Sequence, residues 1–277
     1  MNWVPLLFID DVCHQLKHEA FNQVSQLSGS WSGFGTEHGE KRREFGFRYE
    51  LNANQIVSYS LPETVAVTVA DLNLEFDRIT YVSCGTAFLD DHRISLREFE
   101  RVVLPTIAPL VMNCSWWYLN AQRSDQNRFF FKAFKNCPGF NTIRVDEQGQ
   151  ELSDFLARQV ELGNVETLYL SGTGNRSEAE MLRKFVNSTR FHALNSLGHL
   201  RDEYKLFELF LERALAKELK RGAFIDIPTN LDKNRLLALH PECRDDLRMD
   251  AWRIPDSNLR IALRHCSGLF ELEMRVE

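Results

Sequence analysis

The chain has 277 residues, of which 44% are hydrophobic and 26% are charged, ordinary values for a globular protein. The net charge of −6 argues against the basic face of a nucleic-acid-binding protein, so we expect no nucleic-acid partner. No stretch approaches the roughly 18 apolar residues of a membrane span, and the start of the chain lacks a basic region and turns acidic, so we expect neither a membrane partner nor a signal peptide.

Six cysteines are scattered along the sequence without a C-x-x-C pair or a close Cys/His group. In a chain of this length without a signal peptide, they are expected to be reduced thiols, most of them buried. Cytoplasm or nucleus is therefore the expected location. The six are Cys13, Cys84, Cys114, Cys137, Cys243 and Cys266.

Residues 1–45 predict a small helical module. Apolar residues at the spacing of one helical face indicate a first helix, and Pro5 suits its first turn because proline already has a helical φ. A second helix is expected to end at Trp31, followed by a glycine-rich turn and a solvated basic helix end at 41–43. The residues expected to hold the module together are Phe21, Val24, Leu27 and Trp31.

These residues resemble an F-box. The F-box pattern opens with Leu-Pro, continues through a helix ending in Ile-x-x-x-Leu, and reaches a Trp after a second helix. The matching positions in this chain are Val4-Pro5, then Val12 and Leu16, then Phe21 at the start of the second helix, and Trp31. Two positions depart from the pattern: Leu6-Leu7 replaces the usual acidic residue, and Lys17-His18 replaces an Asp-Pro turn. The segments VPLLFIDDV, LSGSW and HGEKRREF are also similar to a large F-box-like family expanded in nematodes.

An F-box docks on the Skp1 adaptor of a cullin-type ubiquitin ligase, so the resemblance implies a Skp1-like adaptor and cullin complex as partners. The Skp1-binding residues that it implies are Val4, Pro5, Leu6, Phe8, Ile9, Val12 and Leu16. Phe8, Val12 and one of Ile9 or Leu16 are expected to face the rest of the protein. The others are expected to stay partly exposed beside Leu6 and Leu7.

Strands and helices are expected to alternate after the module. Phe45, Phe47 and Tyr49 alternate with polar residues and predict a strand, and Val65, Val67 and Val69 predict another. Helical patterns cover Leu96 to Leu110, Leu152 to Leu162, Met181 to Val186, and Leu206 to Leu215.

A weak repeat runs through this region. Apolar residues recur in a frame φ-x-x-φ-x-φ that begins at residues 79, 116, 140, 165 and 191, and the last four starts are 24 to 26 residues apart. One strand and one helix per unit of about 20–29 residues is typical of leucine-rich repeats. Because the Asn that should follow each strand motif is missing, a generic α/β fold remains the alternative.

The C-terminal part predicts a different arrangement. A short strand is expected at Phe224 to Ile227, a helix at Asn230 to Leu239, and two or three antiparallel strands between Trp252 and Val276. The predicted fold is therefore α/β: the helical module in 1–45, then in 46–277 a leucine-rich-repeat-like domain. In that domain a curved parallel sheet with helices ends in antiparallel strands.

No motif predicts catalysis, a cofactor or a metal. Ser171 to Asn175 lies where a phosphate loop would lie, but it lacks the Lys and predicts a plain turn. The pairs Asp10-Asp11 and Asp90-Asp91 are more typical of helix ends and turns than of metal ligands. His14 and His18 have metal-pair spacing but no third ligand in range.

Two main hypotheses remain. In the first, the chain is a non-catalytic substrate-recognition adaptor that docks on Skp1 and binds an unknown protein target through the α/β domain. In the second, it is an interaction scaffold of the same fold without Skp1 binding. An enzyme with an unrecognised site is the third and least favoured alternative.

Overall fold

The chain divides into two compact units, residues 1–117 and 118–277. The predicted boundary after residue 45 lies within the first unit, where helices give way to strands. The computed structural model describes residues 4–51, 56–61, 67–84, 92–118, 128–145, 149–171, 176–198, 200, 203–229, 251–254, 257–266 and 269–277.

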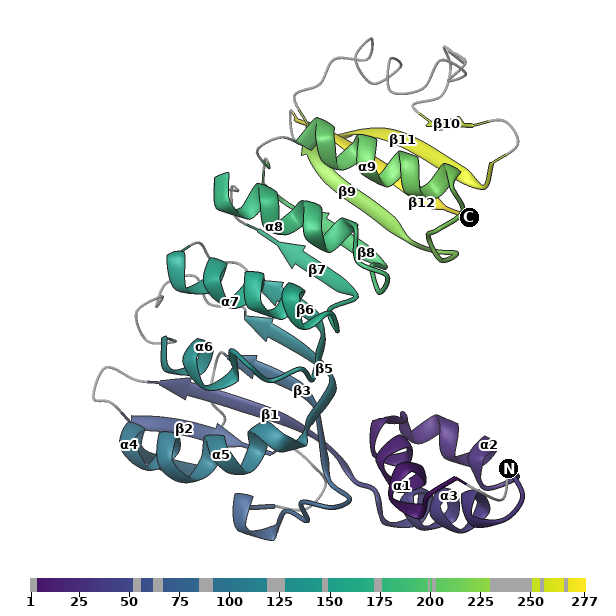
Figure 1. Cartoon of the computed structure of the whole chain (residues 1–277). Helices are drawn as coiled ribbons and strands as arrows, with labels where there is room; N and C mark the ends of the chain where they lie inside the picture. The colour runs from purple at the N-terminus through teal and green to yellow at the C-terminus, as the bar shows by residue number, and fades with distance from the viewer. Residues whose placement is uncertain are drawn as a thin grey trace. The chain divides into compact units, whose positions relative to one another are not determined.

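The first unit begins with helices and continues as a sheet (Figure 1). Its helical segments are α1 (Leu6–Gln15), η1 (His18–Ala20), α2 (Phe21–Val24), α3 (Ser30–Lys41), η2 (Val69–Asp71), α4 (Leu96–Glu98), the π-helical η3 (Phe99–Val103), α5 (Leu104–Ile107) and η4 (Ala108–Leu110). Its strands are β1 (Glu44–Leu51), β2 (Ile56–Ser60), β3 (Arg78–Cys84), β4 (His92–Ser95) and β5 (Val111–Tyr118), in the order β5-β3-β1-β2-β4. Strand β1 is parallel to β3 and antiparallel to β2.

The second unit alternates helices with parallel strands and ends in antiparallel strands. Its helices are α6 (Arg128–Phe134), α7 (Gln150–Leu162), α8 (Arg176–Val186) and α9 (Glu203–Leu215). Its strands are β6 (Phe140–Val145), β7 (Thr167–Leu170), β8 (Ala193–Ser196), β9 (Phe224–Thr229), β10 (Ala251–Arg253), β11 (Leu259–Cys266) and β12 (Leu269–Val276). The strands from β6 to β9 are parallel neighbours, and β12, β11 and β10 continue antiparallel from β9.

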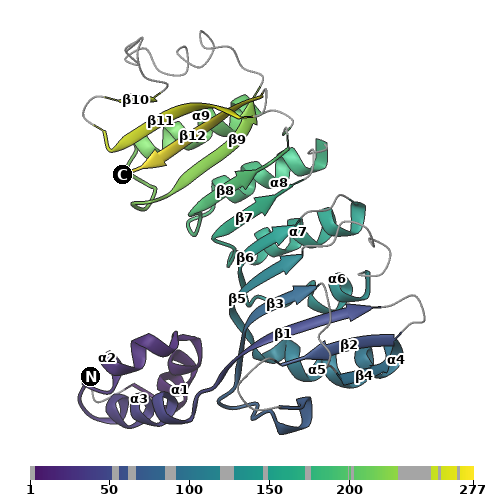
Figure 2. The same ribbon diagram turned by 180° about the vertical axis from the view of Figure 1, so that it is seen from behind.

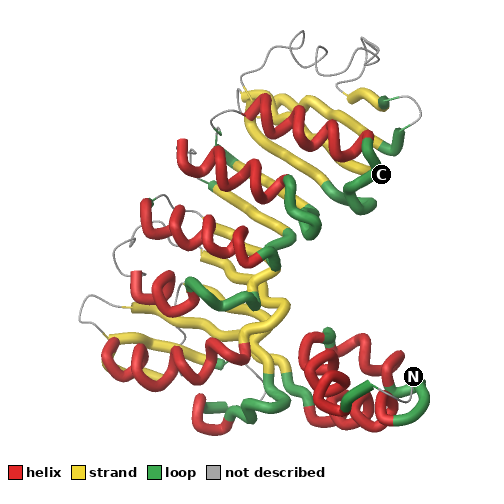
Figure 3. Tube along the Cα trace, viewed as in Figure 1, coloured by secondary structure: helices red, strands yellow, loops and turns green. Residues whose placement is uncertain are grey.

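The repeat frame correctly predicts the core of the second unit. Its central residues are paired across the strands, Ile143 with Leu168 and Leu168 with Leu194. Leu194 is paired in turn with Ile225 of the separately expected strand at 224–227, and all four residues are fully buried. Helices α7, α8 and α9 lie on one face of these strands, and no helix in the described part of this unit covers the other (Figures 1 and 2). The predicted fold class is confirmed: N-terminal helices, then mostly parallel strands with helices, then antiparallel strands (Figure 3).

The glycine-rich turn predicted after Trp31 is wrong, because these residues form helix α3. A Cβ added at Gly35 would lie 2.7 Å from the backbone nitrogen of Ser25, and one at Gly39 would lie 3.3 Å from Phe21 Cβ. Glycine therefore permits close packing of α3 against α2, and this outweighs its low helix propensity. The expected second helix is reduced to η1 and α2, since the chain leaves the helix before Gly29, whose φ is +70°.

The strand predicted around Val67 is also wrong. Residues 67 and 68 lie outside any strand, and Val69–Asp71 form η2, while Val65 lies outside the described residues. The Asp71 carboxylate accepts hydrogen bonds from the Thr68 backbone N–H (2.9 Å) and hydroxyl (2.7 Å). This cap satisfies the start of a helical turn, so local capping prevails over the alternating valines. The helix expected at 230–239 also lies outside the described residues.

Candidate functional site

Only one face of helix α1 packs into the core of the helical module (residues 4–43). Its first turn is closed by the Pro5 carbonyl, which accepts hydrogen bonds from the backbone N–H groups of Phe8 (3.0 Å) and Ile9 (3.2 Å). The buried core consists of Ile9, Cys13, Phe21 and Val24, and the partly buried residues packed against it are Val4, Leu16, Trp31 and Phe34.

The first turn of α1 presents three large apolar side chains to solvent. Their exposed fractions are 57% for Leu6, 79% for Leu7 and 53% for Phe8, and we call them the apolar strip. Single exposed apolar residues are common on protein surfaces, but a contiguous group is typical of an interaction site. The core of the module is complete without them, so folding of the described chain does not bury the apolar strip.

The structure separates the residues that the F-box resemblance groups together. Leu6, Phe8 and Pro5 are exposed, Val4, Val12 and Leu16 are half-buried, and Ile9 is buried in the core. The expectation that Phe8 faces the interior is wrong, because Ile9 and Cys13 occupy the inner face of the helix. Ile9 is therefore unsuitable as a surface variant, since its truncation would disturb the core.

The four residues expected to hold the module together behave differently from one another. Phe21 and Val24 are buried, and Trp31 is partly buried against the core. Leu27 is 49% exposed, so its expected place in the core is wrong. The cause is the short second helix: α2 ends at Val24, and Leu27 belongs to the turn before α3.

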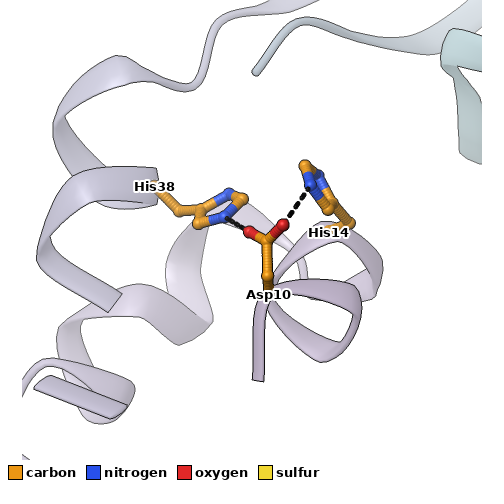
Figure 4. A group of neighbouring side chains, drawn as sticks. All are labelled: Asp10, His14 and His38. Carbon is orange, nitrogen blue, oxygen red and sulfur yellow. Dashed lines mark hydrogen bonds and ion pairs between the residues drawn. The ribbon is translucent and has the colours of Figure 1, made fainter. Parts of the chain in front are cut away.

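A carboxylate and two histidines join α1 to α3 (Figure 4). Asp10 Oδ1 accepts a hydrogen bond from His38 Nε2 at 2.8 Å, and its Oδ2 lies 3.3 Å from His14 Nε2. The two imidazole rings meet edge to face with centroids 4.7 Å apart, and the buried His38 ring also stacks on Phe21. The sequence offered the Asp10–His14 spacing of four residues, but His38 comes from another helix and His18 lies beyond the end of α1.

The surroundings of His14 disfavour its protonated form. The Arg78 guanidinium donates to His14 Nδ1, so the imidazole proton belongs on Nε2, facing Asp10. Burial, and then the positive charge of Arg78, lower the pKa of His14 below its ordinary value. Burial alone would raise the pKa of Asp10, but hydrogen bonding and charge from His38 and His14 lower it below its ordinary value.

The same three residues are the metal-ligand candidates found among the described residues, because their ligand atoms all lie within 4.8 Å of one another. Metal-bound histidines usually donate their second ring N–H to an acceptor. Here the second nitrogen of His14 faces the donor Arg78, and that of His38 is buried without a hydrogen-bond partner in the described chain. The residues therefore do not fit a metal, and they form a hydrogen-bonded clamp between two helices.

Arg42, predicted to be solvated, is buried and closes the end of α1. Its guanidinium donates to the carbonyls of Leu16, Cys13 (3.2 Å) and His14 (2.9 Å). A cation at these carbonyls satisfies groups that the end of a helix leaves unpaired and complements the helix dipole. Further contacts connect the module to the sheet of the first unit, such as the Asn113 side chain donating to the Gln15 carbonyl at 3.0 Å.

No protein-family model, curated protein or solved structure matches this chain. Within the described residues, no helix has both the length and the apolar character that crossing a membrane requires. Of the phosphate-loop candidate at 171–175 only Ser171 is described, and the acidic pair at 90–91 lies outside the described residues.

Proposed function

We propose that the chain is a non-catalytic adaptor whose apolar strip docks on a Skp1-like subunit of a cullin-type ubiquitin ligase. The observation that carries the proposal is the exposure of Leu6, Leu7 and Phe8 on a module whose core is already formed. The strip coincides with the segment that resembles the docking helix of an F-box. Leu6-Leu7 replaces the usual acidic position, so the partner surface has to be apolar there.

Burial of the strip would supply substantial binding energy. Each large apolar side chain taken fully from water contributes about 1.5–3 kcal/mol, and part of this offsets the cost of association. Because these side chains do not support the core, the module can form before the partner arrives.

The uncovered face of the β6–β9 strands is the surface proposed for a protein target. Arg144, Tyr169, Asn195 and Asp226 are paired in register across this face, and all four are half-buried. Asn195 donates a hydrogen bond to Asp226 at 3.2 Å, which fixes two of the polar groups. A fixed row of mixed polar groups suits recognition of a protein surface better than burial of a small apolar ligand.

Co-purification of the full chain with recombinant Skp1 tests the proposal. Wild-type protein should retain Skp1, and the double variant Leu6→Ser, Leu7→Ser should lose it while keeping its melting temperature. Leu197→Ser, which replaces an equally exposed leucine in the second unit, is the matched control and should bind as wild type does. Wild-type protein that never retains Skp1 would contradict the adaptor proposal.

A scaffold without Skp1 binding is the second candidate, and the polar contacts between the module and the sheet of its own unit favour it. Arg43 forms an ion pair with the buried Asp77 at 2.6 Å, and Arg78 at the start of β3 contacts His14 of α1. In this case the module caps the sheet, and serine variants of the strip change no partner.

A further inference from the structure

A cavity of about 130 Å³ lies in the first unit where the end of α1 meets the sheet. It is lined on one side by residues that follow α1 and α3, and on the other by residues of β3 and β5. Its volume is about ten times what one buried water needs. Lys17, Glu19 and Glu44 on its lining are exposed, so the cavity opens to solvent.

Two arginines on the cavity lining, Arg42 and Arg78, are each only 6% exposed. The outer nitrogens of Arg42 donate to the carbonyls at the end of α1, and those of Arg78 donate to the Asp77 carbonyl and to His14 Nδ1. The Nε atoms of both arginines are buried and have no hydrogen-bond partner among the described residues.

Among the described residues, neither positive charge of this pair is held in an ion pair, although Glu44 acts on Arg42 from a distance, and Asp77 and Asp10 act on Arg78. Across the described chain, neither guanidinium forms an ion pair: Asp77 is paired with Arg43, and Asp10 with the two histidines. Burial and the neighbouring Arg78 lower the pKa of Arg42 to about 10, and burial lowers the pKa of Arg78. Buried charges are normally paired, so an anion in the adjoining cavity would balance these two.

We infer that this cavity binds a single phosphate group, as inorganic phosphate or as the phosphate of a small monoester. Arginine suits this role because a guanidinium stays charged when buried and forms charge-assisted hydrogen bonds with phosphate. The hydroxyl of Thr80 and the ammonium of Lys17 supply further donors around the cavity. Glu19 and Glu44 also line it, but both are exposed and remain hydrated. The inference does not rest on the docking of the apolar strip.

Arginine Nε–Hε resonances of the full chain, followed by NMR, test the inference directly. Titration with inorganic phosphate should move the signals of Arg42 and Arg78 along one saturable curve, and sodium chloride of equal ionic strength should not. Arg213 is the matched control, because it is also buried but its Nε already donates to Glu218 at 3.1 Å. Signals that stay in place, move in step with Arg213, or respond equally to chloride would overturn the inference.

Two variants and two further ligands sharpen the test. Lys17→Ala, on the exposed lining, should weaken phosphate binding about two- to fivefold without unfolding the chain. Lys184→Ala removes an exposed lysine in the second unit and should leave binding unchanged. An unaltered dissociation constant in Lys17→Ala would contradict the assigned cavity. Tighter binding of glycerol 3-phosphate than of phosphate would identify a monoester as the occupant, whereas acetate binding as tightly as phosphate would overturn the assignment.

Discussion

The helical module and the strand–helix units of the second unit distribute their side chains in opposite ways. In β6 to β9 the central apolar residues are buried. The buried charges of the same unit, Arg213 on α9 and Glu273 on β12, each have an ion-pair partner, Glu218 at 3.1 Å and Arg275 at 2.9 Å. In the helical module four large apolar side chains are exposed, three of them grouped in the first turn of α1 and the fourth, Leu27, before α3. Its buried Arg42 is held by carbonyl groups rather than by a carboxylate.

The difference separates residues that serve folding from residues that serve binding. Exposing apolar surface and burying unpaired charge both cost free energy in an isolated domain. Among its described residues the second unit pairs its buried charges, and its two exposed large apolar side chains, Leu197 and Leu215, come from separate segments. The module and its junction with the sheet carry both costs, and the exposed strip and the charged cavity are therefore where we propose that ligands act.

The largest expected effect is on the core of the second unit. Phe191→Ala should lower the free energy of unfolding by about 3–5 kcal/mol, because its buried ring packs against Phe185 and Phe210 at centroid distances of 5.1 and 6.0 Å. Denaturant titration measures this. Leu197→Ala, at an exposed position, should change stability by less than about 0.5 kcal/mol, and equal losses in both variants would contradict the assigned core.

A smaller loss is expected where two helices of the module approach closely. Gly35→Ala should cost about 1–3 kcal/mol, because the new Cβ would lie 2.7 Å from the backbone nitrogen of Ser25. Gly33→Ala, with no atom within 4 Å of its added Cβ, should stabilise the helix by up to about 1 kcal/mol. Thermal unfolding of the two variants should therefore shift in opposite directions, and shifts of the same sign would argue against the packing of α3.

The His14 clamp should make the stability of the module depend on pH. The pKa of His14 is lowered by folding from its ordinary value of 6.5, so folding releases a proton in the window below that value. Its contribution is complete above about pH 6.5 and is lost as the pH falls through the lowered pKa. The groups acting on it are Asp10, His38, Arg42 and Arg78.

Denaturant titrations between pH 7 and pH 5 measure this dependence. His14→Gln should flatten the slope by at most about 1.4 kcal/mol per pH unit, the limit for one proton. A slope unaffected by His14→Gln would show that the clamp does not titrate in this range.

How much could be predicted from the sequence differs between the same two regions. The frame that includes Ile143, Leu168 and Leu194 predicts β6, β7 and β8, because each strand buries the same positions against one layer of helices. The alternating residues near the C-terminus predicted β11 and β12 for the same reason. Periodicity is a reliable signal where burial alone determines which side chains turn inward.

The structure of the module depends on glycine packing and polar contacts, which a periodic apolar pattern does not show. Glycines at 33, 35 and 39 indicate a turn by propensity, yet they lie in α3 because Gly35 and Gly39 allow α2 to approach. Arg42 is expected in solvent because its neighbours are charged. It is instead buried, and it donates hydrogen bonds to the carbonyls at the end of α1. The clamp of Asp10, His14 and His38 depends on contact between two helices, and only the spacing of Asp10 and His14 within one helix is visible in a sequence.

The apolar strip provides the most direct test, by measuring affinity and stability on the same variants. The full chain and its Leu7→Ser, Phe8→Ser variant should unfold within about 0.5 kcal/mol of each other, since neither side chain supports the core. Calorimetric titration with Skp1 should show binding by the wild type and an affinity at least about tenfold lower for the variant. Unchanged affinity, or a loss of binding that accompanies unfolding, would contradict the account that these exposed residues form the docking surface.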